Sequence, residues 1–487
     1  MRFVTRFGSA LLAGLLMVPA VVGSVPARAD NQTATVSKVK TDTSKIPYTI
    51  KLRPVSKTSK TLPNLQSFVS GEVDGLWVII GGRTNGLHDF TNSGLKNFPP
   101  SKQNRRIWVI DPWTGNRWGR KLSDSSLTKD QVDALSSTAQ QAYQVGNTLY
   151  VIGGYGYSRS EKNFKTFKSL TAFDLDKIVA WVRNPGSLPS KDRDLANLIR
   201  QTSHSILKVT GGHVTKLGSR TILAFGQLFD GGYGDPDFKQ VYTEQVRSFT
   251  VSDDGKSVDI AKLRRDPTTP NPEDYRRRDY PLVPYLQMKK GKPKARAVAL
   301  AGVFTETDGM FTVPVEIDPQ GRPSMADPDD PSTFKQPMSG YDVAYLPIWD
   351  SKTKTSHNVL FAGISYVYYD KRTDTFVEDD AYPFIKDISV LTRDSKGKYK
   401  QTLLGQFPTV RSTDGKQLRF GAEAEVFVNP AMPVTKNGMI DLREVRKAFG
   451  KKKIVAGHLF GGIASDAGNN GNTVASNLIF KIVLVPR

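Results

Sequence analysis

The chain repeats one pattern of hydrophobic and polar positions, in which short apolar runs end at glycine-rich turns. The pattern is clearest over residues 140–175, where the runs AYQV, LYVI and LTAFDL are separated by polar residues. β-Branched and aromatic side chains dominate each run, which is typical of strands. Gly146 and Asn147 tolerate positive φ and predict a tight turn between the first two runs. This stretch therefore predicts three antiparallel strands.

The same three-run unit occurs six times. One such unit has nothing to bury its faces against, so we expect the copies to pack on one another. A fourth strand follows several copies, and in the second copy the pattern assigns it to residues 178–182. Helical patterns are confined to residues 127–135 and 441–449, where Asp441 is a suitable cap. The copies cover residues 67–111, 140–175, 213–251, 281–318, 343–394 and 424–485.

Six copies of about 74 residues each predict a radial array rather than a stacked solenoid. The predicted fold class is therefore all-β, a six-bladed β-propeller with four-stranded antiparallel blades. The last copy stops after three strands, and the strand predicted over residues 48–53 belongs to no copy. We expect this N-terminal strand to become the outer strand of the last blade, because that placement closes the ring and protects two exposed sheet edges.

Doubled glycines end the second strand of three copies, at residues 81–82, 153–154 and 461–462. A strand end that swings away close to another backbone favours residues without Cβ, so these glycines have a structural role. Aromatic residues, Trp118 and Trp181, lie near the ends of the first two predicted blades. Together with an aspartate after the third strand, these features resemble the kelch repeat.

The wider pattern, with RRDY at residues 277–280, is similar to a family of bacterial secreted kelch-like propellers without an established activity. The resemblance extends over residues 46–487 and implies the galactose oxidase-like propeller fold, but no chemistry. The copper-radical site of galactose oxidase-type enzymes needs a cysteine, and this chain contains none. That activity is therefore excluded, and we expect no cofactor.

Residues 1–29 have the features of a cleavable signal peptide. Arg2 and Arg6 precede an apolar run at residues 10–22, which is too short to span a membrane comfortably. Residues 27–29, Ala-Arg-Ala, match the small-x-small cleavage rule. We therefore expect a secreted or periplasmic protein without a further membrane segment.

The rest of the chain divides into a flexible leader at residues 30–45 and a single propeller domain at residues 46–487. The lack of cysteine excludes disulfides and a lipid-modified N-terminus, and favours a bacterial origin. The net charge of +21 becomes +18 without the signal peptide's three arginines. This charge predicts attraction to an anionic envelope polymer. Nucleic acid is disfavoured, because no recognition motif is present, and we expect a monomer.

Candidate binding residues belong to one predicted face. Connections between second and third strands share that face with connections between blades, and long insertions at residues 83–105 and 365–386 extend it. Aromatic faces with nearby charged groups suit a sugar ring or an extended polar polymer. The candidates are Arg83, His88, Tyr155, Tyr157, Asp230, Tyr233, Arg277, Arg278, Asp279, Tyr366 and Tyr368.

Other interpretations of individual motifs stay open. Arg277 and Arg278 either brace neighbouring loops through carboxylates or bind an anion. The five histidines lack zinc-type spacing, so no metal site is predicted. Acidic turns such as residues 235–237 offer calcium ligands but are also typical of turns. Basic runs at residues 289–296 and 451–453 lie in hairpin turns on the opposite face.

The sequence favours an exported, non-enzymatic β-propeller that recognises a glycan or an envelope protein through its loop-rich face. The alternative is a carbohydrate-active enzyme, a hydrolase or lyase, with carboxylates contributed by different blades. A purely structural envelope component is a third possibility. An enzyme should bring two carboxylates together in the central funnel, at least one of them with a raised pKa. A binding module should instead expose aromatic patches.

Overall fold

The computed structural model describes residues 36–55, 62–88, 93–306 and 309–487. The predicted signal peptide, residues 1–29, lies outside the described residues. The described part of the predicted leader contacts the fifth sheet, where the Lys40 amide donates to the Gln401 carbonyl at 3.0 Å. Strands make up 45% of the chain and helices 11%, so the fold is all-β. No helix in the described ranges is both long enough and apolar enough to cross a bilayer.

Three antiparallel sheets of one order occupy the first half of the chain, with consecutive strands joined in hairpins. The first contains β2 (Val69–Val73), β3 (Leu76–Ile80), β4 (Arg106–Ile110) and β5 (Arg117–Lys121); the second contains β6 (Gln141–Val145), β7 (Thr148–Ile152), β10 (Ser169–Asp174) and β11 (Ile199–Ser203); the third contains β12 (His213–Leu217), β13 (Arg220–Ala224), β16 (Val246–Asp253) and β17 (Val258–Asp266).

Three more sheets of this kind follow, and the fifth gains a short parallel strand, β29 (Ile440–Asp441), beside β22. The fourth contains β18 (Leu282–Lys289), β19 (Lys292–Ala299), β20 (Val315–Ile317) and β21 (Pro323–Met325); the fifth contains β22 (Tyr345–Asp350), β23 (Thr355–Phe361), β26 (Asp387–Arg393) and β27 (Tyr399–Gln406); the sixth contains β28 (Ala424–Val428), β30 (Ile454–Gly461), β33 (Ile479–Pro486) and β1 (Tyr48–Pro54).

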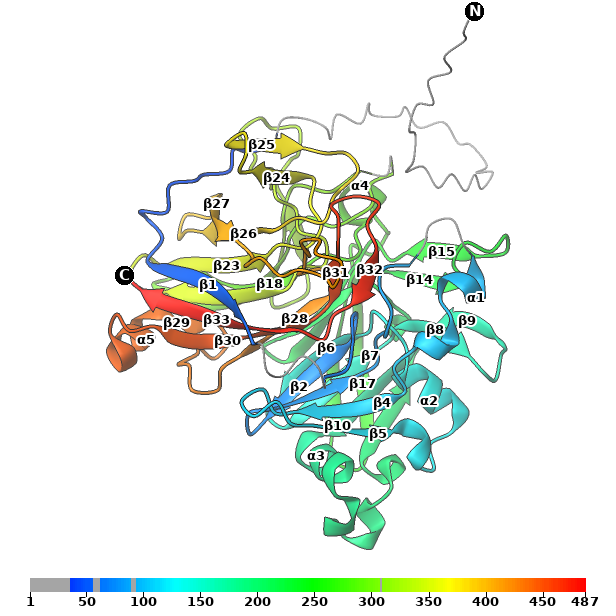
Figure 1. The fold of residues 1–487 in the computed structure, drawn as a ribbon. Helices are drawn as coiled ribbons and strands as arrows, with labels where there is room; N and C mark the ends of the chain where they lie inside the picture. The colour runs from blue at the N-terminus through cyan, green and yellow to red at the C-terminus, as the bar shows by residue number, and fades with distance from the viewer. Residues whose placement is uncertain (1–35, 56–61, 89–92, 307–308) are drawn as a thin grey trace, which may run out of the picture.

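The N-terminal strand β1 pairs with the last strand, as the sequence predicted. β1 is antiparallel to β33 over its whole length, and Figure 1 shows the blue strand beside the red one. Its side chains alternate: Tyr48, Ile50 and Leu52 are buried in the core shared by the fifth and sixth sheets, whereas Lys51 is exposed. The two ends of the chain are therefore held together in one sheet.

Each of the six sheets packs against the next. The first strands β2, β6, β12, β18, β22 and β28 contact one another in that order. The sixth sheet also packs against the first, because Trp77 stacks on Phe427 with ring centroids 4.1 Å apart. These first strands therefore gather around a common axis.

Insertions between second and third strands build additional structure at one end of the sheets. Hairpins β8 (Tyr155–Ser158)–β9 (Asn163–Thr166) and β14 (Gln227–Asp230)–β15 (Lys239–Tyr242) join into a further four-stranded sheet. Two more hairpins are β24 (Val367–Asp370)–β25 (Thr375–Glu378) and β31 (Ile463–Ser465)–β32 (Thr473–Ala475). The sequence predicted polar loops here, and did not anticipate these strands.

The helical predictions are partly confirmed. Helices α2 (Lys129–Leu135) and α5 (Leu442–Phe449) lie where predicted, and Asp441 caps α5; α1 (Gly94–Asn97) and α4 (Pro272–Tyr275) are short additions.

The fourth strand predicted at residues 178–182 is wrong, because this segment belongs to helix α3 (Leu175–Arg183). The fourth strand of the second sheet is β11 instead. The Asp174 side chain caps α3 by accepting from the Lys177 amide. Leu175, Ile178 and Trp181 are buried at helical spacing. The β-branched run had suggested a strand, but this cap and this spacing favour a helix.

The doubled glycines have the structural role expected of them. Gly82 and Gly153 both have positive φ. A Cβ at Gly153 would lie 2.1 Å from the Val209 carbonyl oxygen, and one at Gly82 would lie 2.5 Å from the Gln66 carbonyl oxygen. Only glycine permits these close approaches, which for Gly82 are within the first sheet and for Gly153 are to the segment that leads into the third sheet.

Candidate functional site

Six residues, each placed immediately before a first strand, form a ring of backbone hydrogen bonds around the axis. Each donates its amide to the carbonyl of the residue from the preceding sheet, and the residue of the first sheet donates to that of the sixth. The N···O distances run from 2.8 to 3.4 Å. We call this set the axial ring: Ser67, Ala139, Gly211, Asp279, Asp342 and Glu423.

All six residues of the axial ring have positive φ, between 31° and 62°. Residues other than glycine avoid this conformation, which costs roughly 1–2 kcal/mol each. The shared hydrogen bonds and the packing of the sheets offset that cost. Because the insertions leave the sheets at the same end, the ring lies at the base of the loop-rich face.

A group of titratable side chains gathers at the ring. Three ring members are acidic, and two further residues on the first strands of the third and sixth sheets join them. They come from four different sheets, so no short sequence motif contains them. We call this group the axial site: His213, Asp279, Asp342, Glu423 and Glu425.

His213 and Asp342 form the best-defined pair of the axial site. The Nε2 atom of His213 lies 3.3 Å from Oδ1 of Asp342. Their side chains are 32% and 21% exposed, so solvent reaches both. Burial lowers the pKa of His213, but the hydrogen bond and charge of Asp342 outweigh it, and the pKa is raised overall.

Glu423 lies on the other side of Asp342. Its carboxyl is within hydrogen-bonding reach of the Asp342 carboxyl and of Ser67. Burial raises the pKa of Glu423 well above its ordinary value, and the negative charges of Asp342 and Asp279 raise it further. Burial and neighbouring negative charge both disfavour the ionised form of Glu423.

Glu425 is a second carboxyl with a raised pKa. Burial raises its pKa to about 7, the charge of Asp342 acts in the same direction, and His213 opposes it. The axial site therefore contains a carboxyl whose pKa is strongly raised, a carboxyl whose pKa is about 7 and a histidine, which are the components of general acid–base chemistry.

Arg278 and Tyr341 complete the surroundings of Asp279. The Asp279 carboxyl lies 3.2 Å from an Arg278 Nη atom and accepts from the Tyr341 hydroxyl at 3.1 Å. The buried Nε of Arg278 has no hydrogen-bond partner within the described ranges. The tyrosine side chains of Tyr233 and Tyr242 act electrostatically on Arg278 as well. This edge of the site therefore has tyrosine hydroxyl groups and one N–H donor, the Arg278 Nε, without a hydrogen-bond partner among the described residues.

Several residues predicted from sequence lie in the small core of the loop-rich face. His88 stacks on Phe98 and packs against Tyr233, and the Arg83 guanidinium lies 4.0 Å from the centre of the Phe98 ring. The buried Tyr155 hydroxyl donates to the Gly231 carbonyl at 2.8 Å.

Two other predicted residues lie beside this core. Tyr157 packs against Phe164, and Asp230 forms an ion pair with Lys208 at 2.8 Å. The structure therefore places these predicted residues in the packing of the loops: Arg83, His88, Tyr155, Tyr157, Asp230 and Tyr233. Of these six, Tyr233 also interacts electrostatically with Arg278 at the edge of the axial site.

Arg277 and Arg278 differ in their surroundings. Arg277 is completely buried, and its guanidinium donates to the carbonyls of Asp274, Ala301 and Val313 at 2.8–2.9 Å. It braces loops, as one sequence interpretation proposed, but through backbone carbonyls instead of carboxylates. Arg278 and Asp279 belong to the axial site and its edge.

The remaining predicted residues, Tyr366 and Tyr368, lie away from the axial site, at the β24–β25 hairpin. The Tyr366 hydroxyl donates to Glu378 at 3.0 Å, and burial together with Glu378 raises the Tyr366 pKa to about 12. Tyr368 lines a pocket of about 440 Å³.

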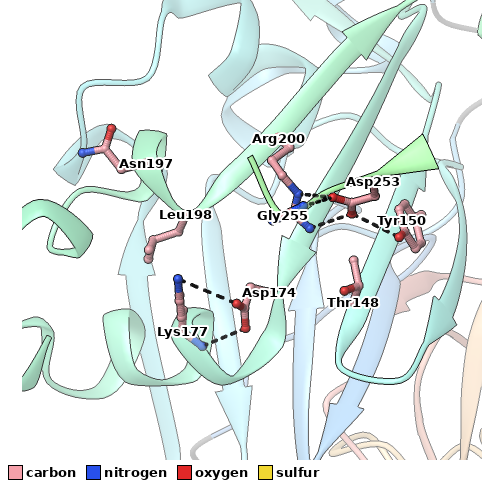
Figure 2. Close-up of a pocket in the computed structure, with 9 residues that line it drawn as sticks. All are labelled: Thr148, Tyr150, Asp174, Lys177, Asn197, Leu198, Arg200, Asp253 and Gly255. Carbon is pink, nitrogen blue, oxygen red and sulfur yellow. Dashed lines mark hydrogen bonds and ion pairs between the residues drawn. The ribbon is translucent and has the colours of Figure 1, made fainter. Parts of the chain in front are cut away.

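A polar cleft of about 330 Å³ lies on the opposite face, between the second and third sheets. Figure 2 shows that its charged groups are paired with one another. Arg200 donates two hydrogen bonds of 2.7 Å to Asp253, and the Tyr150 hydroxyl donates to the same carboxylate at 3.1 Å. The ion pairs of this cleft join two sheets, and its charged side chains are already paired with each other.

Within the described ranges no group of three or more His, Asp or Glu side chains is arranged to hold a metal ion.

Comparisons with known proteins identify no family. No protein-family model matches the sequence, and no curated protein matches it. Among solved structures, that of a protein named YjhT covers 88% of this chain and 98% of its own length, at 10% sequence identity and a TM-score of 0.41. A similarity at this level says nothing about what this chain binds or does.

Sequence reasoning found Asp279 but missed His213, Asp342, Glu423 and Glu425. The missing signal was positional: Asp279, Asp342 and Glu423 each stand just before a first strand. Aligning the six copies at that position would have placed three acidic residues at equivalent points.

Proposed function

We propose that the protein is a closed six-bladed β-propeller whose axial site performs acid–base catalysis on a carbohydrate. The axial ring supports closure and blade number, because it contains one residue from each of six sheets and its last hydrogen bond joins the sixth to the first. The pairing of β1 with β33 and the stacking of Trp77 on Phe427 add to this support.

The observation that carries the enzymatic proposal is the Asp342–Glu423 carboxyl pair. A carboxyl that keeps its proton at neutral pH is able to donate it to a glycosidic oxygen as the bond to the sugar breaks. A deprotonated group beside it then takes a proton from water in hydrolysis, or from a sugar carbon in elimination. Asp342, His213 and Glu425 are candidates for that second role.

A carbohydrate suits the surroundings of the site. Tyr341, Tyr233 and Arg278 present hydroxyl and guanidinium groups beside the carboxyls. Sugar hydroxyls exchange hydrogen bonds with such groups. Burying several titratable side chains is unfavourable for stability, and such clusters are typical of functional sites.

The test is a turnover screen of the mature protein with a panel of neutral and acidic polysaccharides. Released reducing ends detect hydrolysis, and ultraviolet absorbance of an unsaturated sugar detects elimination. On an active substrate, Glu423→Gln should lower kcat by about 10²-fold to 10⁴-fold while substrate binding remains. Asp253→Asn, in the cleft on the opposite face, is the control and should keep full kcat. Full activity of Glu423→Gln, or no turnover of any polysaccharide, would count against the proposal.

The second candidate is an exported, non-enzymatic module that binds a glycan or an anionic envelope polymer. Burial of Tyr155 and the packing of His88 in the loop core weaken it, because these aromatic faces are not free for a ligand. The pocket of about 440 Å³ at the β24–β25 hairpin favours it, because Lys386 and Arg419 line that pocket. Export and a monomeric state are part of both proposals.

A further inference from the structure

A second pocket opens on the loop-rich face, away from the axial site. It has a volume of about 440 Å³, and lies between the β24–β25 hairpin of the fifth sheet and the loop around Asn469 of the sixth. Two half-buried cations, Lys386 and Arg419, line it together with Tyr368 and Gln406. We call it the basic pocket.

Lys386 and Arg419 are only partly balanced by carboxylates: Asp387 and Asp370 act on Lys386 from beyond ion-pair distance, and Asp466 acts on Arg419 in the same way. Neither side chain forms a hydrogen bond or an ion pair in the part of the chain that the structure describes. Burial lowers the pKa of Lys386, and the charge of Arg419 lowers it further. Burial also lowers the pKa of Arg419. Two unpaired cations in one half-buried pocket repel each other, and an anion between them would remove that repulsion.

The carboxylates of the pocket are already engaged by protein groups. Asp370 forms an ion pair with Arg372 at 2.9 Å, and Asp379 accepts from the Asn469 side chain at 3.2 Å. Asp370 partly offsets the charge of Lys386, but neither carboxylate forms an ion pair with Lys386 or Arg419.

Asp387 lies at the back of the pocket. It accepts from the Tyr369 amide at 2.7 Å and from the Gln406 side chain at 2.6 Å, and burial raises its pKa. The pocket is lined by four cationic side chains and three carboxylates, so its net charge is positive.

The shape and walls of the pocket suit a sugar. A volume of this size holds one or two monosaccharide units. Tyr368 and Phe384 supply aromatic surface, on which the C–H face of a sugar ring packs favourably. The planar guanidinium of Arg419 matches the two oxygens of a carboxylate.

We propose that the basic pocket binds a carboxylated saccharide, a uronate unit of an acidic glycan. The carboxylate lies between Lys386 and Arg419, and the sugar ring packs on Tyr368. The site does not depend on catalysis at the axial site. The cleft in Figure 2 is a useful contrast, because its arginine already holds the carboxylate of Asp253.

The experiment is calorimetric titration of the mature protein with tetragalacturonate, with cellotetraose as the neutral probe and sodium phosphate as the small-anion probe. Tetragalacturonate should bind, cellotetraose should not, and phosphate should bind more weakly because it leaves the aromatic wall empty. The double variant Lys386→Gln/Arg419→Gln should raise the Kd for tetragalacturonate at least tenfold. Tyr368→Ala should weaken tetragalacturonate but leave phosphate unchanged.

The matched control is Lys451→Gln/Lys452→Gln, which removes the same charge from exposed positions on the opposite face and should change the Kd less than twofold. Melting curves check that each variant is folded. Equal Kd values for wild type and the pocket variant, or an equal loss in the control, would overturn the proposal, and so would phosphate binding as tightly as tetragalacturonate. Glu423→Gln should bind tetragalacturonate normally, which separates this test from that of the proposed catalysis.

Discussion

His213 Nε2 lies 3.3 Å from Asp342 Oδ1, and this contact joins the third sheet to the residue that precedes the fifth. The two residues are distant in the sequence. They meet because the axial ring joins Gly211, two residues before His213, to Asp279 and then joins Asp279 to Asp342. The same carboxyl of Asp342 raises the pKa of Glu423. One aspartate therefore links the histidine to the Glu423 carboxyl, whose pKa is strongly raised.

Asp342→Asn should lower the pKa of His213. The variant removes the hydrogen bond and the charge that raise it, and leaves the burial that lowers it. NMR titration of histidine ring signals measures the change, and His213→Gln identifies the signal among the five histidines. An unchanged His213 pKa would mean that the pair is not formed in solution.

Glu425→Gln should change how stability depends on pH. Burial raises the pKa of Glu425 from 4.5 to about 7, so the folded state holds a proton that the unfolded state releases. The stability from this proton is fully present below pH 4.5 and is lost as pH rises through 7. The variant resembles the neutral form, so it should equal wild type at low pH and exceed it by about 1–2 kcal/mol at pH 8.

Urea unfolding at several pH values measures this difference. Glu306→Gln changes an exposed carboxyl and serves as the control, with no trend expected. A constant offset between wild type and Glu425→Gln across pH 5–8 would argue against a raised pKa.

Leu52→Asp should destabilise the protein by at least about 3 kcal/mol, because it places an unpaired charge in the core of β1. Lys51→Asp, at the neighbouring exposed position of the same strand, should cost less than about 1 kcal/mol. Urea midpoints compare the two. Equal, small effects would show that β1 is not needed to hold the sixth sheet.

Gly211→Ala and Ala139→Gly should act in opposite directions on the axial ring. Gly211 has φ 62°, and a Cβ there would lie 2.6 Å from an Asp279 carboxylate oxygen. Its replacement should cost about 1–3 kcal/mol. Ala139 has φ 48°, so glycine relieves strain and should be neutral or stabilising by up to about 1 kcal/mol. Thermal unfolding measures both, and a destabilised Ala139→Gly would contradict the strained ring.

The strands could be predicted from the sequence, because buried strands such as β7 and β13 are short apolar runs between turns. The pairing of β1 followed from an edge left unpaired in the last copy. Helix α3 was missed because the β-branched residues Ile178 and Val179 favour a strand. The structure forms a helix there because Asp174 caps it and Trp181 is buried on its inner face.

Most residues of the axial site could not be predicted from the sequence. Its ring uses Ser, Ala, Gly, Asp and Glu at equivalent positions, since the backbone conformation and not the side chain is repeated. His213 and Glu425 are single residues on different strands, and only the arrangement of the sheets brings them together. The loop aromatics were correctly placed on one face, but their packing against each other depends on tertiary contacts such as His88 on Phe98.

The proposed catalysis requires that Glu423 keep a proton at neutral pH, as its burial and the nearby charge of Asp342 favour. Infrared spectroscopy of the folded protein at pH 7 tests it, because a protonated carboxyl absorbs apart from ionised carboxylates. A carboxylic-acid band should be present in wild type and reduced in Glu423→Gln, with Asp253→Asn unchanged. Identical spectra of wild type and Glu423→Gln in this region would contradict the account.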